Sequence, residues 1–293
     1  MAINSFKFMS KTLAESLKVW PYVDTRTELI PWTPLKKQLR ECRVTLVSSG
    51  GLYQRDDTPF DMDREKKEPL WGDPTFREIP RGVKQDEIRT AHLHYENVHA
   101  LQDYNCMLPA AILEELYAAG EIGGITDHHL TFMGYQPKPG IFMRETAPRM
   151  ADRLIELGAD IVLLSPGGPL CNLSVGLAQR IMEKKGLSTI CLTQMPYITE
   201  KIGVPRALAV EFPFGMIWGR PNDHETHRLV MRHMLQAAQE ITSPGTIVEF
   251  APRWPDDLTA LRDWFPKEPP PWLTSPEKVK QMMDFIQHGN PLE

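Results

Sequence analysis

The chain has 293 residues, 42% of them hydrophobic and 24% charged, which is enough to bury the core of one large α/β domain. The formal net charge is −5, and no Lys/Arg cluster is long enough to indicate nucleic-acid binding. No apolar run approaches the roughly 20 residues needed to cross a bilayer, so we expect a cytoplasmic protein with no membrane or nucleic-acid partner.

The first quarter of the chain predicts a helix over residues 10–18, a Pro/Trp-rich connector, and a first strand over residues 43–47. That strand ends in the small residues Ser48-Ser49-Gly50-Gly51, a loop that suits either a tight turn or the close approach of a ligand. Residues 55–82 show no clear periodicity and are expected to be irregular, as functional loops and lids often are.

The alternation in residues 90–95, TAHLHY, predicts a second strand with His92 and His94 on one face. Further elements follow in order: helices over 110–119 and 147–157 around a short strand within 123–134, strands over 161–164, 188–192 and 206–213, and helices over 173–182, 224–241 and 276–288.

This alternation of strands and helices predicts a doubly wound α/β fold, a mostly parallel sheet with helices on both faces. No clean linker is present, so we expect a single domain over 1–293. Its parts are an N-terminal extension (1–40), a core (41–241) and a C-terminal extension (242–293), the extensions being irregular and rich in Pro and Trp.

Cys171 is the strongest candidate for chemistry. It follows the apolar run 161–164 and a Gly/Pro-rich loop, and it precedes a helical pattern with Asn172 or Ser174 as its N-cap. A thiol at a helix N-terminus is expected to have a lowered pKa, and its thiolate is the reactive form. The alternative is a small buried core residue, which is common for free cysteine.

Several histidines could transfer protons or bind a metal, because imidazole titrates near neutral pH and is a frequent ligand. His92 and His94 share a face, and His128 follows in a later strand. The alternative is ordinary packing. The sequence names neither a metal nor a cofactor, although a metal bound by these histidines stays open. No P-loop, GxGxxG or HExxH motif is present.

Several blocks of the sequence, in order, resemble a known family. They are VTLVSSGGLY…DDTPFD at 44–61, GDPTFREIP at 72–80, HLHY…DYNCMLPAAILEELYAAGEIGGI at 92–125, HHLTFMGY at 128–135 and ADIVLLSPGGPLCNLSVGLAQRIMEKKG at 159–186. The chain is similar to the selenoprotein B family of glycine/sarcosine/betaine reductase and D-proline reductase, especially its short D-proline-reductase-like members. The resemblance implies an α/β fold and reductive cleavage of a C–N bond in a small amino acid or betaine.

The resemblance places a selenocysteine or cysteine before the Pro of the strand-to-helix loop and a second thiol after it. Here Gly168 stands at the first position and only Cys171 matches, so the loop cannot close a disulfide. We select Cys171, His92, His94 and His128 as catalytic candidates. Substrate-binding candidates are Ser49, Gly50, Gly51, Asp57, Asn105, Gly167, Gly168 and Asn172, with the backbone N–H groups of Gly167 and Gly168 suited to a carboxylate.

Three functions follow from these residues. The first is an enzyme that acts on a small amino acid or related carboxylate through Cys171. The second is a lyase or hydrolase that works without redox chemistry, because Gly168 leaves room where a side chain is expected. The third is a non-catalytic subunit of a partner enzyme. The expected partners are a small-molecule substrate and either further copies of the chain or a partner subunit.

Overall fold

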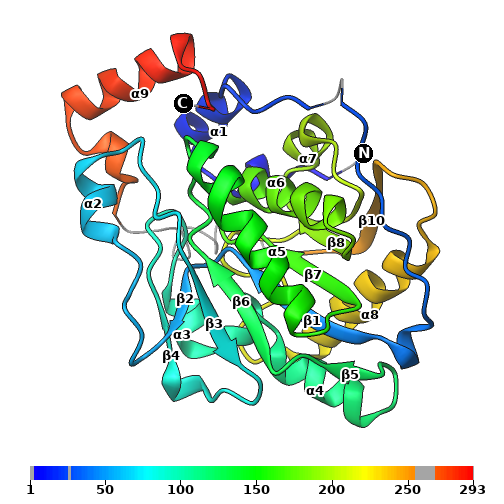
Figure 1. The fold of residues 1–293 in the computed structure, drawn as a ribbon. Coiled ribbons are helices and arrows are strands. Elements are labelled where there is room, and N and C mark those ends of the chain that lie inside the picture. Colours follow the sequence, from blue (N-terminus) through cyan, green and yellow to red (C-terminus); the bar gives the residue numbers. More distant parts are fainter. Residues whose placement is uncertain (1–2, 26–27, 255–267, 293) are drawn as a thin grey trace.

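A mostly parallel, eight-stranded sheet forms the centre of the molecule, with the strand order β10-β9-β8-β7-β1-β6-β3 and β5 beside β1 (Figure 1). This computed structural model describes residues 3–25, 28–254 and 268–292. Every pairing in the sheet is parallel except that of β3 with β6. A separate antiparallel pair is formed by β2 and β4. The α/β fold expected from the alternation of elements is confirmed.

The strands are β1 (Arg43–Ser48), β2 (Leu52–Gln54), β3 (Phe76–Pro80), β4 (Ile88–Thr90), β5 (Gly124–Ile125), β6 (His128–Phe132), β7 (Ile161–Ser165), β8 (Ser188–Thr193), β9 (Arg206–Glu211) and β10 (Thr246–Arg253). The α-helices are α1 (Lys11–Lys18), α2 (Met62–Lys67), α3 (Val98–Gln102), α4 (Ala110–Ala118), α5 (Ala147–Glu156), α6 (Cys171–Lys184), α7 (Pro196–Ile202), α8 (His224–Glu240) and α9 (Pro276–His288). Shorter helical turns are η1 (Ser5–Phe8), η2 (Leu39–Glu41), η3 (Gln85–Glu87), η4 (Tyr104–Cys106), η5 (Phe142–Thr146) and η7 (Pro271–Leu273).

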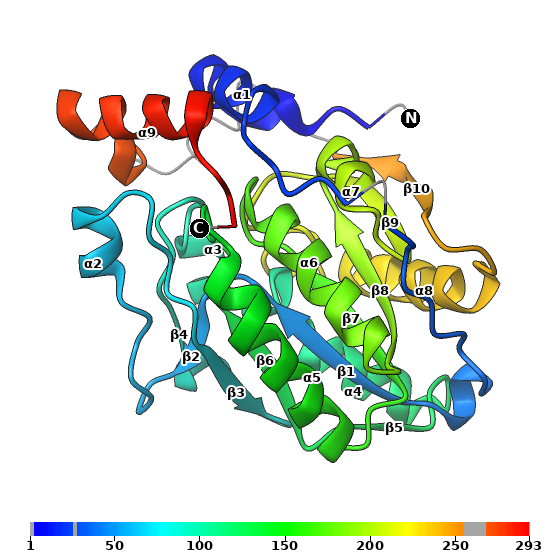
Figure 2. The ribbon, with the colours of Figure 1, turned by 45° about the horizontal axis from the view of Figure 1, so that its top comes forward.

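Helices cover both faces of the sheet, with α5, α6 and α7 on one face and α4 and α8 on the other (Figures 1 and 2). The central strands are mostly apolar because helices cover both faces of the sheet, and all five residues of β7 are buried. The longest helix begins at a cap that the sequence supplies: the side chain of Asp223 accepts a hydrogen bond from the N–H of Thr226 at the start of α8.

Four local expectations are wrong. Residues 91–95 form a bend rather than a strand, since β4 ends at Thr90. Residues 55–82 contain α2 and β3, whose short spans and charged residues hide their period. Helix α6 begins at Cys171 itself, so neither Asn172 nor Ser174 is its N-cap. The C-terminal extension supplies β10, which extends the sheet beyond residue 241 and pairs with β9.

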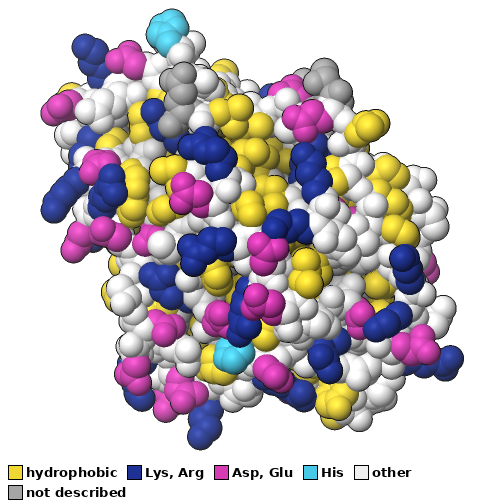
Figure 3. Space-filling view, viewed as in Figure 1, with side chains coloured by type: hydrophobic (Ala, Val, Ile, Leu, Met, Phe, Trp, Pro, Cys, Tyr) yellow, Lys and Arg dark blue, Asp and Glu magenta, His cyan; other side chains and the backbone are white. Residues whose placement is uncertain are grey.

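The two ends of the chain lie together across the top of the molecule, where α1 and α9 run over the sheet edge (Figure 2). Their contact includes Trp20 and Phe285, whose rings meet edge to face with centroids 5.6 Å apart. In the face shown in Figure 3, hydrophobic side chains gather in the upper half and charges of both signs are interspersed below. No helix among the described residues is long and apolar enough to span a membrane.

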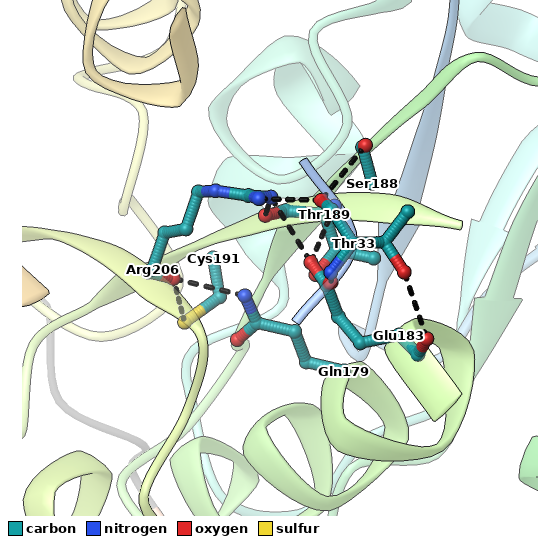
Figure 4. Close-up of polar contacts among 7 residues, drawn as sticks. All are labelled: Thr33, Gln179, Glu183, Ser188, Thr189, Cys191 and Arg206. Atoms are coloured by element: carbon teal, nitrogen blue, oxygen red, sulfur yellow. Dashed lines mark hydrogen bonds and ion pairs between the residues drawn. The ribbon is translucent and has the colours of Figure 1, made fainter. Parts of the chain in front are cut away.

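A buried ionic cluster joins the connector that follows α1 to the core (Figure 4). The guanidinium of Arg206, at the start of β9, lies 3.0 Å from the carboxylate of Glu183 on α6 and donates to the carbonyls of Thr33 and Thr189. The same guanidinium stacks 3.8 Å from the ring centroid of Trp32. The Pro/Trp-rich connector is therefore fixed by buried charge rather than by secondary structure.

Candidate functional site

Cys171 lies at the carboxyl edge of the sheet, where parallel α/β sheets bind ligands. Strand β7 ends at Ser165, the loop 166–170 turns, and α6 begins at Cys171. The loop is held by Asn172, whose side-chain amide donates to the carbonyls of Gly168 and Pro169 at 3.2 and 3.0 Å. The sulfur is thus presented by a loop that is tied down on both sides.

Hydrogen-bond donors surround the sulfur. The Nε2 of His92 lies 3.2 Å from the Sγ of Cys171. The Ser49 hydroxyl and the backbones of Gly168 and Gly167 also form hydrogen bonds that lower the pKa of this thiol. Ser49 accepts in turn from the N–H of Gly167 at 3.0 Å. Such a set of donors stabilises a thiolate when one forms.

Burial nevertheless raises the pKa of Cys171 to about 11, because it outweighs those hydrogen bonds. The side chain is 1% exposed. The lowered pKa expected from the helix N-terminus is therefore wrong for this state. Cys171 is a neutral thiol near pH 7, in a surrounding that stabilises the anion once its proton has left.

The hydrogen bonds of His92 fix the position of its proton. Its Nδ1 accepts from the backbone N–H of His94 at 3.1 Å, so the neutral ring carries its proton on Nε2 and directs it at the sulfur. Burial, with the charge of His94 second, holds the pKa of His92 well below its usual range. His92 therefore serves the sulfur as a donor and not as a base.

His94 is arranged in the opposite way. Its Nε2 lies 2.6 Å from the carboxylate of Glu65, a side chain on α2 with no exposed surface. The ring stacks on Tyr135 at 3.8 Å between centroids. Because Glu65 engages Nε2, Nδ1 is the nitrogen left for a bound molecule, an arrangement also found in carboxylate–histidine pairs that transfer protons.

A cavity of about 570 Å³ reaches Cys171 and His94. Its floor is made by the 93–96 and 169–171 segments, and its roof by η1, α1 and η7. The two extensions that the sequence left as irregular therefore build half of the cavity. The volume lies in the range of about 300–1,000 Å³ that is typical of ligand sites.

Gly50 and Gly51, which follow Ser49, allow the segments of the site to pack closely together. Gly51 has φ +64°, and a Cβ there would lie 2.4 Å from the carbonyl oxygen of Ala91. A Cβ at Gly50 would lie 2.7 Å from the Cε of Met107. These contacts let the bend that carries His92 pack closely on the end of β1.

Four other candidates lie outside the cavity or are already engaged. His128 begins β6, at the opposite end of that strand from Gly134. Six residues of extended chain span roughly 20 Å, so His128 lies about that far from Gly134. The carboxylate of Asp57 accepts from Gln54 in a turn. Asn105 joins Asp103 to Ala111, and the Oδ1 of Asn172 accepts from Thr193 and Gln194. Their roles in binding stay predictions.

Gly168 lies against the reactive groups. A Cβ there would lie 3.6 Å from the Sγ of Cys171, 3.5 Å from the Cε1 of His92 and 3.2 Å from the carbonyl oxygen of His94. The N–H groups of Gly167 and Gly168, expected to hold a substrate carboxylate, are directed at Ser49 and the sulfur instead. Of the four cysteines, Cys171 alone lines this cavity among the described residues.

Among the described residues, no group of three or more His, Cys, Asp and Glu side chains is placed to hold a metal ion.

Two members of the site were not found from the sequence. Glu65 is hidden in the charged run MDREKK, where nothing distinguishes it from its exposed neighbours. Gly134 could be suspected from its place in a quoted block, and a Cβ there would lie 2.5 Å from the Sγ of Cys171.

Several known proteins are similar to this chain in sequence. The family model for glycine/sarcosine/betaine reductase selenoprotein B matches residues 19–166. The D-proline reductase subunit gamma of Acetoanaerobium sticklandii is 33% identical over 217 residues, which cover 74% of this chain and 86% of that one. The glycine reductase complex component B subunit gamma of Carboxydothermus hydrogenoformans is 24% identical over 64% of this chain and 42% of its own.

The sarcosine reductase complex component B subunit beta of Peptoclostridium acidaminophilum is 22% identical over 75% of this chain and 50% of its own length. The chain thus spans about half of these longer component B subunits and most of the D-proline reductase subunit. No solved structure matches it. These relatives are named as subunits of reductases, several of them multi-component complexes.

Proposed function

This chain belongs to the glycine/sarcosine/betaine reductase selenoprotein B family, and from that premise we propose that it cleaves a carbon–nitrogen bond reductively at the sulfur of Cys171. The observation that carries the proposal is the surrounding of that sulfur. Donors from Ser49, Gly167, Gly168 and His92 meet at one buried thiol, which opens on a cavity beside a carboxylate–histidine pair. The substrate is an amine next to a carbonyl group, a class that includes amino acids.

In the first step the thiol proton passes to His94 by way of a molecule bound in the cavity that both residues line, and the thiolate attacks the carbon that carries the amine. The C–S bond forms, the C–N bond breaks, and the amine leaves with the electron pair and takes the proton back from His94. The donors around the sulfur stabilise the thiolate that precedes the attack. Glu65 stabilises the imidazolium that His94 becomes.

In the second step a dithiol from outside this chain supplies two electrons. One of its sulfurs attacks the Sγ of Cys171, an S–S bond forms, and the C–S pair moves to the carbon next to the carbonyl group and is protonated. The second sulfur of the dithiol then releases Cys171. The balance is one amine replaced by hydrogen and one dithiol oxidised to a disulfide. Gly168 makes the outside dithiol necessary, since this loop has no second thiol.

A partner subunit belongs to the same proposal. The relatives are subunits of reductases, and a dithiol carrier must reach a sulfur that is 1% exposed. Docking of such a carrier, or of a neighbouring subunit, therefore has to move the segments that roof the cavity. Further copies of this chain are the other expected arrangement.

The test is ammonium release from an α-amino carbonyl compound in the presence of dithiothreitol. We expect one dithiol oxidised for each ammonium released, and no turnover by Cys171→Ala. Cys191→Ala is the matched control, because Cys191 is also buried but its thiol donates to the backbone carbonyl of Arg206, away from the cavity. Unchanged turnover by Cys171→Ala would refute the proposal.

A redox-independent lyase or hydrolase is the second candidate, favoured by the room beside Gly168, where a Cβ would approach three reactive groups without a backbone clash below 3.0 Å. It predicts repeated ammonium release without any dithiol. Release that stops after one equivalent per chain, and resumes when dithiothreitol is added, excludes it.

A further inference from the structure

The residues that line the cavity above Cys171 indicate which class of ligand it can bind, beyond what the proposed reaction requires. Its walls are mostly apolar, with large side chains from the roof and from the 213–214 segment. The aromatic members are Phe8, Trp20, Tyr95, Tyr135, Phe214 and Trp272. Most of the roof, including η1, α1 and η7, lies outside the residues 19–166 that match the family model. The shape of the cavity is therefore set in part by segments that lie outside the match to the family model.

The charges that line the cavity have one sign. Glu96 and Glu268 contribute carboxylates, and no Lys or Arg is among the lining residues that the structure describes. A substrate carboxylate is normally held by Arg, Lys or free backbone N–H groups. Here the N–H groups of Gly167 and Gly168 are directed at Ser49 and the sulfur. A carboxylate bound in this cavity would therefore lose its hydration without gaining a Lys or Arg partner among the described lining residues.

The same walls suit a cation. An ammonium group is attracted by carboxylates and by the faces of aromatic rings, and both are present at this cavity. The apolar volume of about 570 Å³ would stay mostly empty around an amino acid as small as glycine. An apolar group attached to the amine would remove that surface from water.

Lysines occur instead in a neighbouring cavity of about 480 Å³ that does not include Cys171. The two cavities share Leu93, Tyr95, Glu96, Glu268 and Pro269. There the ammonium of Lys278 donates to the carbonyl of Lys66 at 2.6 Å and to the hydroxyl of Thr274 at 3.2 Å. A carboxylate held by these lysines would be separated from the sulfur by the 92–96 wall.

We propose that the site takes a hydrophobic ammonium compound whose carboxyl group is masked as an amide or ester. This inference rests on the proposed function for the reaction, since the masked carboxyl still supplies the carbonyl group that the second step needs. The binding preference, however, depends only on the apolar walls, Glu96 and Glu268, so it can be measured without turnover.

The experiment is a calorimetric titration with racemic phenylalaninamide, phenylalanine and alaninamide. Phenylalaninamide carries both the ammonium and the apolar group, phenylalanine adds a carboxylate, and alaninamide lacks the ring. We expect phenylalaninamide to bind at least about tenfold more tightly than either of the others, because each lacks one match to the walls. The titration is repeated with Cys171→Ala, which keeps the cavity but cannot react.

The charge variant is Glu268→Arg, at the rim of the cavity, with Glu277→Arg on α9 as a control of equal charge change. Glu268→Arg should narrow the preference for the amide over the acid by about fivefold, while Glu277→Arg leaves it unchanged. Phenylalanine binding as tightly as its amide overturns the inference, as does binding of none of the three at millimolar concentration or an equal effect of both variants. Selective binding without any turnover overturns only the proposed reaction.

Discussion

Two buried clusters of polar groups lie within this fold, and they differ in how completely their charges are matched. In the cluster of Arg206, the two carboxylate oxygens of Glu183 accept from Thr189, Thr33 and the guanidinium (Figure 4). In the site, one oxygen of the buried Glu65 bonds to His94 and the other has no hydrogen-bond partner among the described residues.

The difference separates structure from chemistry. Several donors hold the Glu183 carboxylate in one position, and its cluster fixes the connector to the sheet. The Glu65 carboxylate has a single histidine partner, and that histidine lines a cavity. Breaking the first cluster should therefore cost stability, and breaking the second should cost turnover.

The largest effect is expected for Arg206→Met. It leaves Glu183 buried without its cation, so the free energy of unfolding should fall by about 3–5 kcal/mol. Arg232→Met is the control, because its partner Glu121 is exposed and such pairs contribute about 0–1 kcal/mol. Urea unfolding of the three chains measures both. A smaller loss of stability in Arg206→Met than in Arg232→Met would show that this cluster has no structural role.

Glu65→Gln should lower turnover rather than stability. The amide keeps the contact to His94 but not the charge that stabilises its imidazolium, so turnover should fall by about a hundredfold while the free energy of unfolding changes little. The matched control is Glu68→Gln, one turn on from Glu65 in an exposed pair with Arg64. Equal turnover in the two variants would show that Glu65 is structural.

The pH dependence of Cys171 follows from its raised pKa. The folded state favours the thiol, so this contribution to stability is fully present below about pH 9 and is lost as the pH rises through about 11. Alkylation of Cys171 by iodoacetamide, followed by peptide mass, should increase up to that range. Ser49→Ala, which removes a donor, should move the midpoint higher. A midpoint below 9.0, the ordinary value, would contradict this account.

The smallest effect on stability is expected for Gly168→Cys. Its Cβ would lie 3.6 Å from the Sγ of Cys171, so a small shift of the carbonyl of His94 lets a disulfide close. The four-residue loop that it closes is short, and the stability gained is correspondingly small. Mass analysis under oxidising conditions should show the loss of both thiol hydrogens. A free pair of thiols would indicate that the loop holds position 168 away from the sulfur.

The sequence predicted the parts of the fold that have a strong period. These parts include the strand in the apolar run 161–164, the helices that end at Gly120 and Gly158, and the helix capped by Asp223. It missed α7 and β10, which are short or half exposed. Residues 91–95 alternate like a strand, but tertiary contacts of Gly51 and Tyr95 bend them.

For the site, the sequence found the residues that carry rare chemistry and missed those that act through burial. Cys171, His92, His94 and Ser49 meet, because each stands at a strand end or a loop at one sheet edge. His128 is a similar residue type at the wrong end of its strand. The raised pKa of Cys171 and the position of Glu65 depend on burial in the folded chain, which no local pattern encodes.

The most direct test of the account is the mass of the Cys171 peptide after incubation with an α-amino carbonyl substrate and no dithiol. We expect one equivalent of ammonium to be released and the substrate carbon to be attached to Cys171, then removed as the reduced product when dithiothreitol is added. Ammonium released in repeated turnovers while Cys171 stays unmodified would contradict the central claim that the buried sulfur is the reacting atom.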